Sequence, residues 1–169
     1  MDVVLREIEP SDVDALAALV ESDPAYVERV TGYPPGPADA QSLLMMRPPD
    51  LAADRKLVLG AWEGDDLVGV VDLLRGWPDE HTVHIGLLQV HGGRQGQGIG
   101  RLVHRLLLDR VRSWPETTTL RAAVVETNAA HAEPFWRASG YQPSGDPKPY
   151  TYDKLHSTVQ IWTRPVAET

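Results

Sequence analysis

The residues best suited to chemistry form a glycine-rich hexapeptide, Gln95-Gly96-Gln97-Gly98-Ile99-Gly100. Glycine lets backbone N–H groups crowd around a ligand without obstruction by side chains. These N–H groups open a helix predicted from Ile99 onward, and the positive end of a helix dipole favours an anion. The hexapeptide therefore predicts a cradle for a phosphate or pyrophosphate group, with a plain tight turn between a strand and a helix as the alternative.

Two common phosphate-binding motifs do not fit this hexapeptide. A P-loop requires Gly-x-x-x-x-Gly-Lys-Ser/Thr, and no lysine follows any glycine of the sequence. The dinucleotide fingerprint Gly-x-Gly-x-x-Gly, read from Gly96 or Gly98, has Arg101 or Val103 at its last position. A dinucleotide site also has an acidic residue about twenty residues later, at the end of a strand, that binds the ribose. In that region of this sequence only Glu116 is available, and it does not follow a predicted strand.

A strand and a helix are predicted on either side of the hexapeptide. Residues 83–90 are mostly β-branched and aliphatic, as in a buried strand. After the glycines, apolar residues recur at the spacing of three and four that gives a helix one buried face: Ile99, Leu102, Val103, Leu106, Leu107 and Val111. These two elements would place the loop N–H groups at the beginning of the helix.

The pattern Gln/Arg-x-x-Gly-x-Gly/Ala, from Gln95 to Gly100, follows a strand valine at Val90. It resembles the coenzyme A pyrophosphate loop of the GCN5-related N-acetyltransferase (GNAT) superfamily. A second motif is also similar to that family's, with a strand, an asparagine and a short helix carrying Phe-Tyr-x-x-x-Gly-Phe. Its counterparts here are residues 120–126, Asn128, Phe135-Trp136 and Gly140-Tyr141. The two motifs together cover residues 81–141.

The resemblance implies transfer of an acetyl group from acetyl-CoA, as co-substrate and without a metal, to an amine. It implies that loop amides hold the pyrophosphate, and that the pantetheine arm contacts Asn128 and the backbone of Leu88 and Val90. It also implies oxyanion donors among backbone amides where the strand bulges, near residues 88–90. The residues implied for coenzyme A binding are Leu88, Gln89, Val90, Gln95, Gly96, Gln97, Gly98, Ile99, Gly100, Arg101, Asn128 and Trp136.

His84 is the first candidate for the base that deprotonates the amine. It is predicted to lie on the same strand face as Val90, where some family members place a catalytic glutamate. Histidine suits that role because it titrates near neutral pH, and a half-exposed strand histidine without a partner is the alternative. Glu126, at the end of the next strand, is a rival base, and Asp72 is a further acidic residue that could face the same cleft.

The sequence differs from the family pattern at the residue that would act as the acid and protonate the coenzyme A thiolate. Many relatives use the tyrosine of the Phe-Tyr pair, and the matching residue here is Trp136, which has no acidic proton. We therefore expect Tyr141, Tyr150 or Tyr152 to supply the proton, or the thiolate to leave unprotonated, because a thiol has a pKa near 8.5. Trp136 is expected to line the tunnel for acetyl-pantetheine.

The amino-acid composition limits the binding partners and the cellular compartment that we expect for this protein. The absence of cysteine excludes disulfides and thiolate metal sites, and His81 and His84 point to opposite strand faces, so no metal is expected. The net charge of −8 argues against nucleic acid and favours neutral or cationic small substrates. No apolar run approaches the ~20 residues of a membrane span, and no secretory signal is visible, so a cytoplasmic location without a membrane partner is expected.

A single domain over residues 1–169 is predicted, of α/β (α+β) class, with a mixed, mostly antiparallel sheet of six to seven strands and helices on both faces. The remaining predicted elements are a strand at 3–8, a helix from Ser11 that ends at Asp23-Pro24, a loop at 33–40, a helix at 39–46, hairpin strands at 56–62 and 67–74, a loop at 142–154 and a strand at 159–163.

The predicted function is acetyl transfer to the primary amine of a small molecule, by direct attack in a ternary complex. A GNAT module that binds acyl-CoA without turnover is one alternative, because the usual tyrosine acid is missing. A protein or peptide N-acetyltransferase is another, although the proline-rich segments 33–49 and 143–149 look suited to closing a pocket. The resemblance also makes a homodimer one expected assembly, and it leaves aminoglycosides, polyamines, amino acids and peptide N-termini as acceptors.

Overall fold

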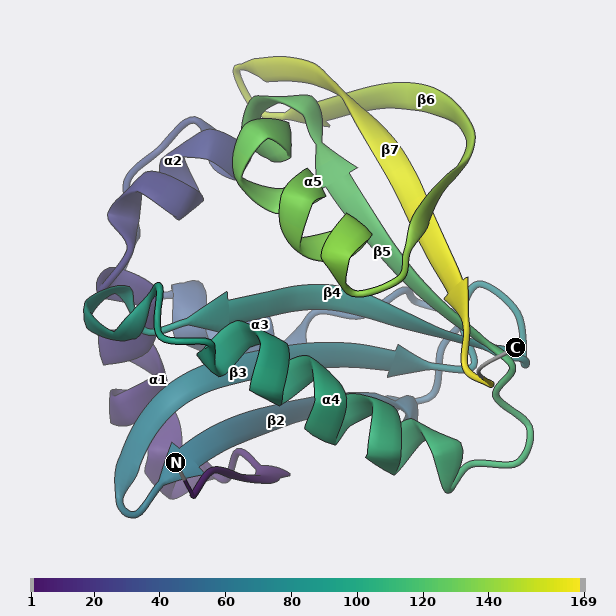
Figure 1. The fold of residues 1–169 in the computed structure, drawn as a ribbon. Coiled ribbons are helices and arrows are strands. Elements are labelled where there is room, and N and C mark those ends of the chain that lie inside the picture. Colours follow the sequence, from purple (N-terminus) through teal and green to yellow (C-terminus); the bar gives the residue numbers. More distant parts are fainter. Residues whose placement is uncertain (1, 168–169) are drawn as a thin grey trace.

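A twisted seven-stranded sheet forms the centre of the structure, a computed structural model that describes residues 2–167 (Figure 1). The strands are β1 (Val4–Glu7), β2 (Lys56–Glu63), β3 (Asp66–Arg75), β4 (Thr82–Val90), β5 (Thr119–Val125), β6 (Gln142–Tyr152) and β7 (Leu155–Pro165). The α-helices are α1 (Val13–Glu21), α2 (Pro24–Thr31), α3 (Asp39–Met45), α4 (Ile99–Arg112) and α5 (Ala129–Ala138). Short 3-10 turns are η1 (Pro10–Asp12), η2 (Ala53–Arg55), η3 (Gly92–Arg94) and η4 (Glu126–Asn128).

The sheet is mixed and mostly antiparallel, as the sequence predicted. Its strand order is β1-β2-β3-β4-β5-β7-β6. Among the described residues, β4 and β5 form the one parallel pair, and α4 provides the crossover between them. The sequence therefore predicted the sheet type and strand number correctly.

Helices cover both faces of the sheet, each over its own apolar core. On one face, α4 and α5 pack against β3, β4 and β5, with Val103, Leu107 and Trp136 in the core. On the other face, α1, α2 and α3 pack against β2 and β3, with Leu16, Leu19 and others in the core. No helix within residues 2–167 has the length and apolar character to cross a membrane.

The helix α2 is absent from the sequence prediction, which took Asp23-Pro24 only as the end of the preceding helix. Helix α1 does end at Glu21, but Pro24 then begins α2 at its first turn. Proline suits that position because the first helical N–H groups have no intrahelical partner. Asp23 caps the helix by accepting the backbone N–H of Tyr26 at 3.4 Å. This unpredicted helix supplies two side chains of the candidate site.

The segment predicted as a loop at 142–154 is instead largely a strand, β6 (Gln142–Tyr152). Its three prolines are tolerated because β6 is an edge strand that pairs only with β7. The pairing register is interrupted between Ser144 and Lys148, so the chain bulges around Pro147. The prediction failed because a proline-rich edge strand lacks the alternating pattern of a buried one.

Candidate functional site

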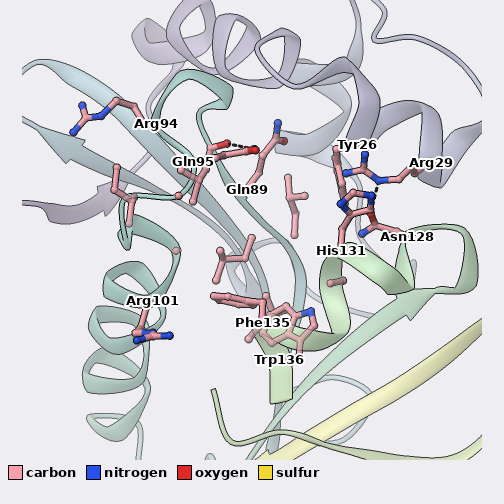
Figure 2. Close-up of a pocket in the computed structure, with 18 of the residues that line it drawn as sticks. Tyr26, Arg29, Gln89, Arg94, Gln95, Arg101, Asn128, His131, Phe135 and Trp136 are labelled. Carbon is pink, nitrogen blue, oxygen red and sulfur yellow. Dashed lines mark hydrogen bonds between the residues drawn. The ribbon is translucent and has the colours of Figure 1, made fainter. Parts of the chain in front are cut away.

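The strands β4 and β5 separate partway along their length (Figure 1). A cavity of about 630 Å³ opens where they part (Figure 2). Their parallel pairing runs from Thr82 to Ile85 of β4 and stops there. Twenty-one residues line the cavity, and they come from β4, η3, the glycine-rich loop, α4, β5, α2, η4 and α5. The gap between the strands thus joins segments that are distant in the sequence.

A β-bulge at Gly86 changes which side chains of β4 face the cavity. In the pairing with β3, Leu73 lies opposite Ile85 and Asp72 opposite Leu87, so Gly86 is the extra residue. The predicted bulge near residues 88–90 is therefore misplaced. The predicted common face of His84 and Val90 is also wrong, because an extra residue reverses the alternation of side chains along a strand.

The bulge leaves the main chain of Leu88 and Val90 directed into the gap. His91 donates its backbone N–H to Val68 of β3 at 2.8 Å. In an antiparallel strand, the backbone N–H and C=O groups of alternate residues point to opposite neighbouring strands. The backbone groups of Gln89 therefore also point to β3. Those of Leu88 and Val90 point the other way, toward the gap where β5 has separated from β4. The peptide groups of Leu88 and the N–H of Val90 are therefore available to an extended ligand lying along β4, whereas the Val90 oxygen already accepts a hydrogen bond from the Gln95 side chain.

The glycine-rich loop closes one end of the cavity and has the geometry of an anion site. Gly96 and Gly98 have φ angles of +78° and +82°, in the region that favours glycine, and a Cβ at either would meet no atom within 4 Å. The first hydrogen bond of α4 runs from the Leu102 N–H to the Gly98 oxygen at 3.1 Å. The N–H groups of residues 99–101 therefore remain outside the helical ladder and open toward the cavity.

Side-chain contacts fix the loop against the rest of the fold. The Gln95 amide nitrogen donates to Asp23 Oδ2 at 2.9 Å and to the Val90 oxygen at 3.3 Å. Arg94 forms an ion pair with Glu63 at 3.1 Å. A rigid loop keeps its N–H groups aligned before a ligand arrives, so less entropy is lost on binding. The open glycines, free amides and rigid frame fit a pyrophosphate.

The opposite end of the cavity holds a polar cluster that we call the α2–α5 cluster: Tyr26 and Arg29 of α2, Asn128 of η4 and His131 of α5 (Figure 2). Arg29 Nε donates to Asn128 Oδ1 at 2.7 Å. This bond leaves the Asn128 amide nitrogen as the group that donates to a ligand. Burial raises the pKa of Tyr26 to about 12, so its hydroxyl stays protonated at neutral pH.

The cavity contains all but one of the residues that the sequence linked to coenzyme A. Gln97 is the exception and does not line it. Trp136 lines the cavity with only 8% of its surface exposed, and its ring lies 4.9 Å from that of Tyr141. The sequence did not single out Tyr26, Arg29 or His131. The one feature of the sequence that could have indicated His131 is its spacing of four residues from Phe135, because this spacing places both side chains on one face of a helix.

None of the three predicted catalytic residues, His84, Glu126 and Tyr141, lines the cavity. His84 lies on the face of β4 opposite that of Val90, is 8% exposed and accepts a hydrogen bond at Nδ1 from Arg121 Nη1 at 2.9 Å. Burial, with Arg121 adding to it, lowers the pKa of His84 to about 3. An imidazole whose lone pair is already bonded is poorly placed to accept a proton from a substrate.

The other acidic and phenolic candidates also lie outside the cavity. Glu126 is solvent-exposed. Asp72 lies beside Gly86 but is paired with Lys56 Nζ at 2.8 Å, in an ion pair whose lysine and aspartate side chains are 6% and 13% exposed. Tyr150 donates its hydroxyl to the Val30 oxygen at 2.7 Å, and Tyr152 is exposed. The structure therefore does not bring these residues to the cavity.

Tyr141 has a structural partner instead. Its hydroxyl forms a 2.8 Å hydrogen bond with His104 Nε2 of α4, and burial raises its pKa. We expect Tyr141→Phe to lower the free energy of unfolding by about 1–3 kcal/mol, because it leaves the buried His104 nitrogen without its partner. Chemical denaturation measures this loss, and kcat should stay within twofold of wild type. A kcat that falls a hundredfold in a folded variant would instead make Tyr141 the acid.

The buried His84 also predicts how stability depends on pH. The folded state keeps His84 neutral down to a pKa of about 3, whereas an unfolded histidine takes up a proton below about pH 6.5. The free energy of unfolding should therefore decrease as pH falls from about 6.5 toward 3, with a slope of about 1.4 kcal/mol per pH unit from this group. Urea titrations at several pH values should give a shallower slope for His84→Gln, and equal slopes would contradict the assignment.

Comparisons with known proteins agree with this geometry. The sequence model described as the acetyltransferase (GNAT) family matches residues 22–141, which is more than half of the chain. No curated protein matches the sequence. An acetyltransferase from Thermus thermophilus is 22% identical with a TM-score of 0.73, over 98% of this chain and 97% of that one.

Two further solved structures differ in what they acetylate. The ribosomal-protein-S18-alanine N-acetyltransferase from Escherichia coli has a TM-score of 0.70 and 17% identity, over 99% of this chain and 96% of that one. The IAA acetyltransferase from Bacillus cereus has a TM-score of 0.60 and 16% identity, over 97% of this chain and 99% of that one. At these identities the likeness shows the fold, and the family match shows membership: this chain belongs to the GNAT acetyltransferase family.

Proposed function

We propose that this protein transfers an acetyl group from acetyl-CoA to the primary amine of a small molecule, by direct attack within a ternary complex. One observation carries the proposal: a single cavity joins an anion cradle at the glycine-rich loop to the α2–α5 cluster at its other end. Such a cavity can hold the anionic end of a long donor at the loop and bring its other end next to an acceptor at the α2–α5 cluster. Acetyl-CoA, when bound, supplies the thioester whose acetyl group is transferred.

The binding residues have distinct roles in this proposal. The N–H groups of residues 99–101 and the open glycines Gly96 and Gly98 hold the pyrophosphate, and Arg101 adds positive charge nearby. The main chain of Leu88 and Val90 binds the pantetheine arm, and the Asn128 amide nitrogen donates to it. Peptide N–H groups after the Gly86 bulge stabilise negative charge on the reacting carbonyl oxygen.

His131 is the proton-transfer group in this proposal. Among the described residues that line the cavity, only Tyr26 and His131 can exchange a proton without the high cost of deprotonating arginine. Tyr26, with a pKa of about 12, holds its proton more strongly than a thiol with a pKa near 8.5, so it donates a hydrogen bond without losing the proton. His131 is solvent-exposed, accepts the proton of the attacking ammonium group and returns one to the leaving thiolate.

Release of free coenzyme A thiol in the presence of an amine panel tests the proposed function. We expect thiol release above the hydrolysis background with at least one small amine, and an acetylated product of the same amine by mass spectrometry. Saturable acetyl-CoA binding without thiol release would favour a non-catalytic binding module. Release only with peptides that have a free N-terminus would favour protein acetylation.

Two further predictions concern assembly and location. The homodimer that the family resemblance implies stays a prediction, which light scattering coupled to size-exclusion chromatography checks. A cytoplasmic location also stays a prediction, and fractionation of expressing cells checks it.

A further inference from the structure

The charge of the cavity is opposite to the charge of the molecule. The chain carries a net charge of −8. Among the described residues that line the cavity, by contrast, none is Asp or Glu and three are arginines, namely Arg29, Arg94 and Arg101. An acceptor amine reaches this cavity as a cation, so the placement of the three guanidinium groups bears directly on which amines bind.

Two of these arginines belong to the glycine-loop end. Arg94 is paired with Glu63 at 3.1 Å and also donates to Gln97 at 3.0 Å. Arg101 lies in the first turn of α4, next to the free N–H groups. Arg29 is the exception, because it projects from α2 at the opposite end, in the α2–α5 cluster (Figure 2).

The guanidinium group of Arg29 is held in place yet keeps donors available. Its Nε donates to Asn128 Oδ1 at 2.7 Å, and the Thr127 hydroxyl donates to the backbone oxygen of Arg29, so α2 is tied to η4 at two points. Within residues 2–167, no acidic side chain forms an ion pair with Arg29. Its two terminal nitrogens therefore keep the planar, end-on arrangement that binds a carboxylate with two hydrogen bonds.

An uncompensated guanidinium group beside the reacting amine penalises a purely cationic acceptor. Two like charges repel strongly in a partly desolvated cavity. Asp72 does not offset this charge, because its carboxylate lies behind Gly86 and is paired with Lys56 at 2.8 Å. A carboxylate on the acceptor itself removes the penalty and satisfies the free donors of Arg29.

From this arrangement we propose that Arg29 binds a carboxylate of the acceptor, and that the preferred acceptors are amines of the amino-acid type. The inference rests on the proposed function, since it names the acceptor class of the same cavity. It disfavours polyamines and aminoglycosides, which carry positive charges without a carboxylate.

Matched pairs of acceptors test this inference. Each pair consists of an amino acid and the amine left when its carboxylate is removed, such as leucine with isopentylamine, and phenylalanine with phenethylamine. We expect kcat/KM for the carboxylated member to exceed that of its partner at least tenfold in the wild-type protein. Equal values within each pair would overturn the inference.

One variant with a matched control tests whether Arg29 binds the acceptor or only supports Asn128. Arg29→Gln removes the charge while leaving an amide that can still donate to Asn128. It should raise KM for the carboxylated acceptor at least tenfold and abolish the preference within each pair, with KM for acetyl-CoA changed less than threefold. Arg105→Gln is the matched control, because Arg105 lies on the exposed face of α4 outside the cavity. An Arg29→Gln variant with a higher KM for acetyl-CoA and an unchanged acceptor preference would overturn the inference.

A binding measurement distinguishes failure of this inference from failure of the proposed function. Calorimetric titration of each pair into protein saturated with coenzyme A requires no turnover. If no amine releases thiol but the amino acids bind more tightly than their partners and Arg29→Gln abolishes the difference, the proposed function fails and the role of Arg29 in binding a carboxylate stands. If thiol release occurs while both members bind equally, the inference fails and the proposed function stands.

Discussion

Replacing Gly98 by valine is expected to raise KM for acetyl-CoA at least tenfold. Gly98 has a φ angle of +82° and caps α4, in a conformation that a β-branched residue adopts only with strain. A Cβ there would meet no protein atom within 4 Å, and Gly98 lines the cavity. The substitution therefore both displaces the free N–H groups and occupies the region assigned to the pyrophosphate. Initial rates at varied acetyl-CoA concentrations measure the effect.

Gly145→Val is the matched control for that substitution. Gly145 has a φ angle of +73°, a Cβ there would also meet nothing within 4 Å, and it lies in β6 outside the cavity. Its backbone strain is therefore comparable, and only its location differs. We expect KM for acetyl-CoA to stay within twofold of wild type in this control. Equal increases in both variants would mean that strain alone, and not the anion site, explains the Gly98 result.

Replacing His131 by glutamine is expected to lower kcat about a hundredfold, the lower end of the range for loss of a general acid–base group. Glutamine retains polarity and hydrogen bonding but cannot transfer a proton. Because His131 is solvent-exposed at the rim of the α2–α5 cluster, its removal should leave the fold unchanged. The free energy of unfolding and KM for acetyl-CoA should stay close to their wild-type values, whereas a purely structural role of His131 would lower the stability together with kcat.

The control for His131 is His81→Gln, at an exposed histidine outside the cavity. It should retain the wild-type kcat and the wild-type free energy of unfolding. The parallel variant His84→Gln addresses the base predicted from sequence, and the observed geometry predicts that it changes kcat less than threefold. A hundredfold loss in His84→Gln with full activity in His131→Gln would reverse the two assignments.

The donor-binding half of the site was predictable because its signals are local in the sequence. Glycines at a strand-to-helix junction, the buried strand before them and the amphipathic helix after them each leave a pattern within a few residues. Most of the cradle between Gln95 and Arg101, the main chain of Leu88 and Val90, and Asn128 lie at the cavity as expected. Their role in binding coenzyme A stays a prediction that the Gly98 variant tests.

The catalytic half was not predictable, because it depends on features that leave no local pattern. The bulge at Gly86 adds one residue to β4 and moves His84 to the face opposite that of Val90. Strand alternation read from sequence has no means of detecting such an insertion. Helix α2 was missed because Pro24 was read as a terminator, and with it Tyr26 and Arg29 were missed as well.

The net charge of the chain and the charge of the cavity differ in sign. A net charge of −8 favoured neutral or cationic acceptors, yet the described cavity residues include three arginines and no acidic side chain. Net charge describes the surface as a whole, whereas specificity depends on the few side chains that face the ligand. The acceptor class could therefore be addressed only once the structure had placed Arg29 beside Asn128.

Calorimetric titration of coenzyme A into the wild-type protein tests the central claim most directly, because the claim is that the cavity between β4 and β5 binds this donor. We predict saturable binding with one site per chain, driven in part by the anion cradle and therefore weaker at higher salt. Absence of binding at millimolar coenzyme A would contradict the account.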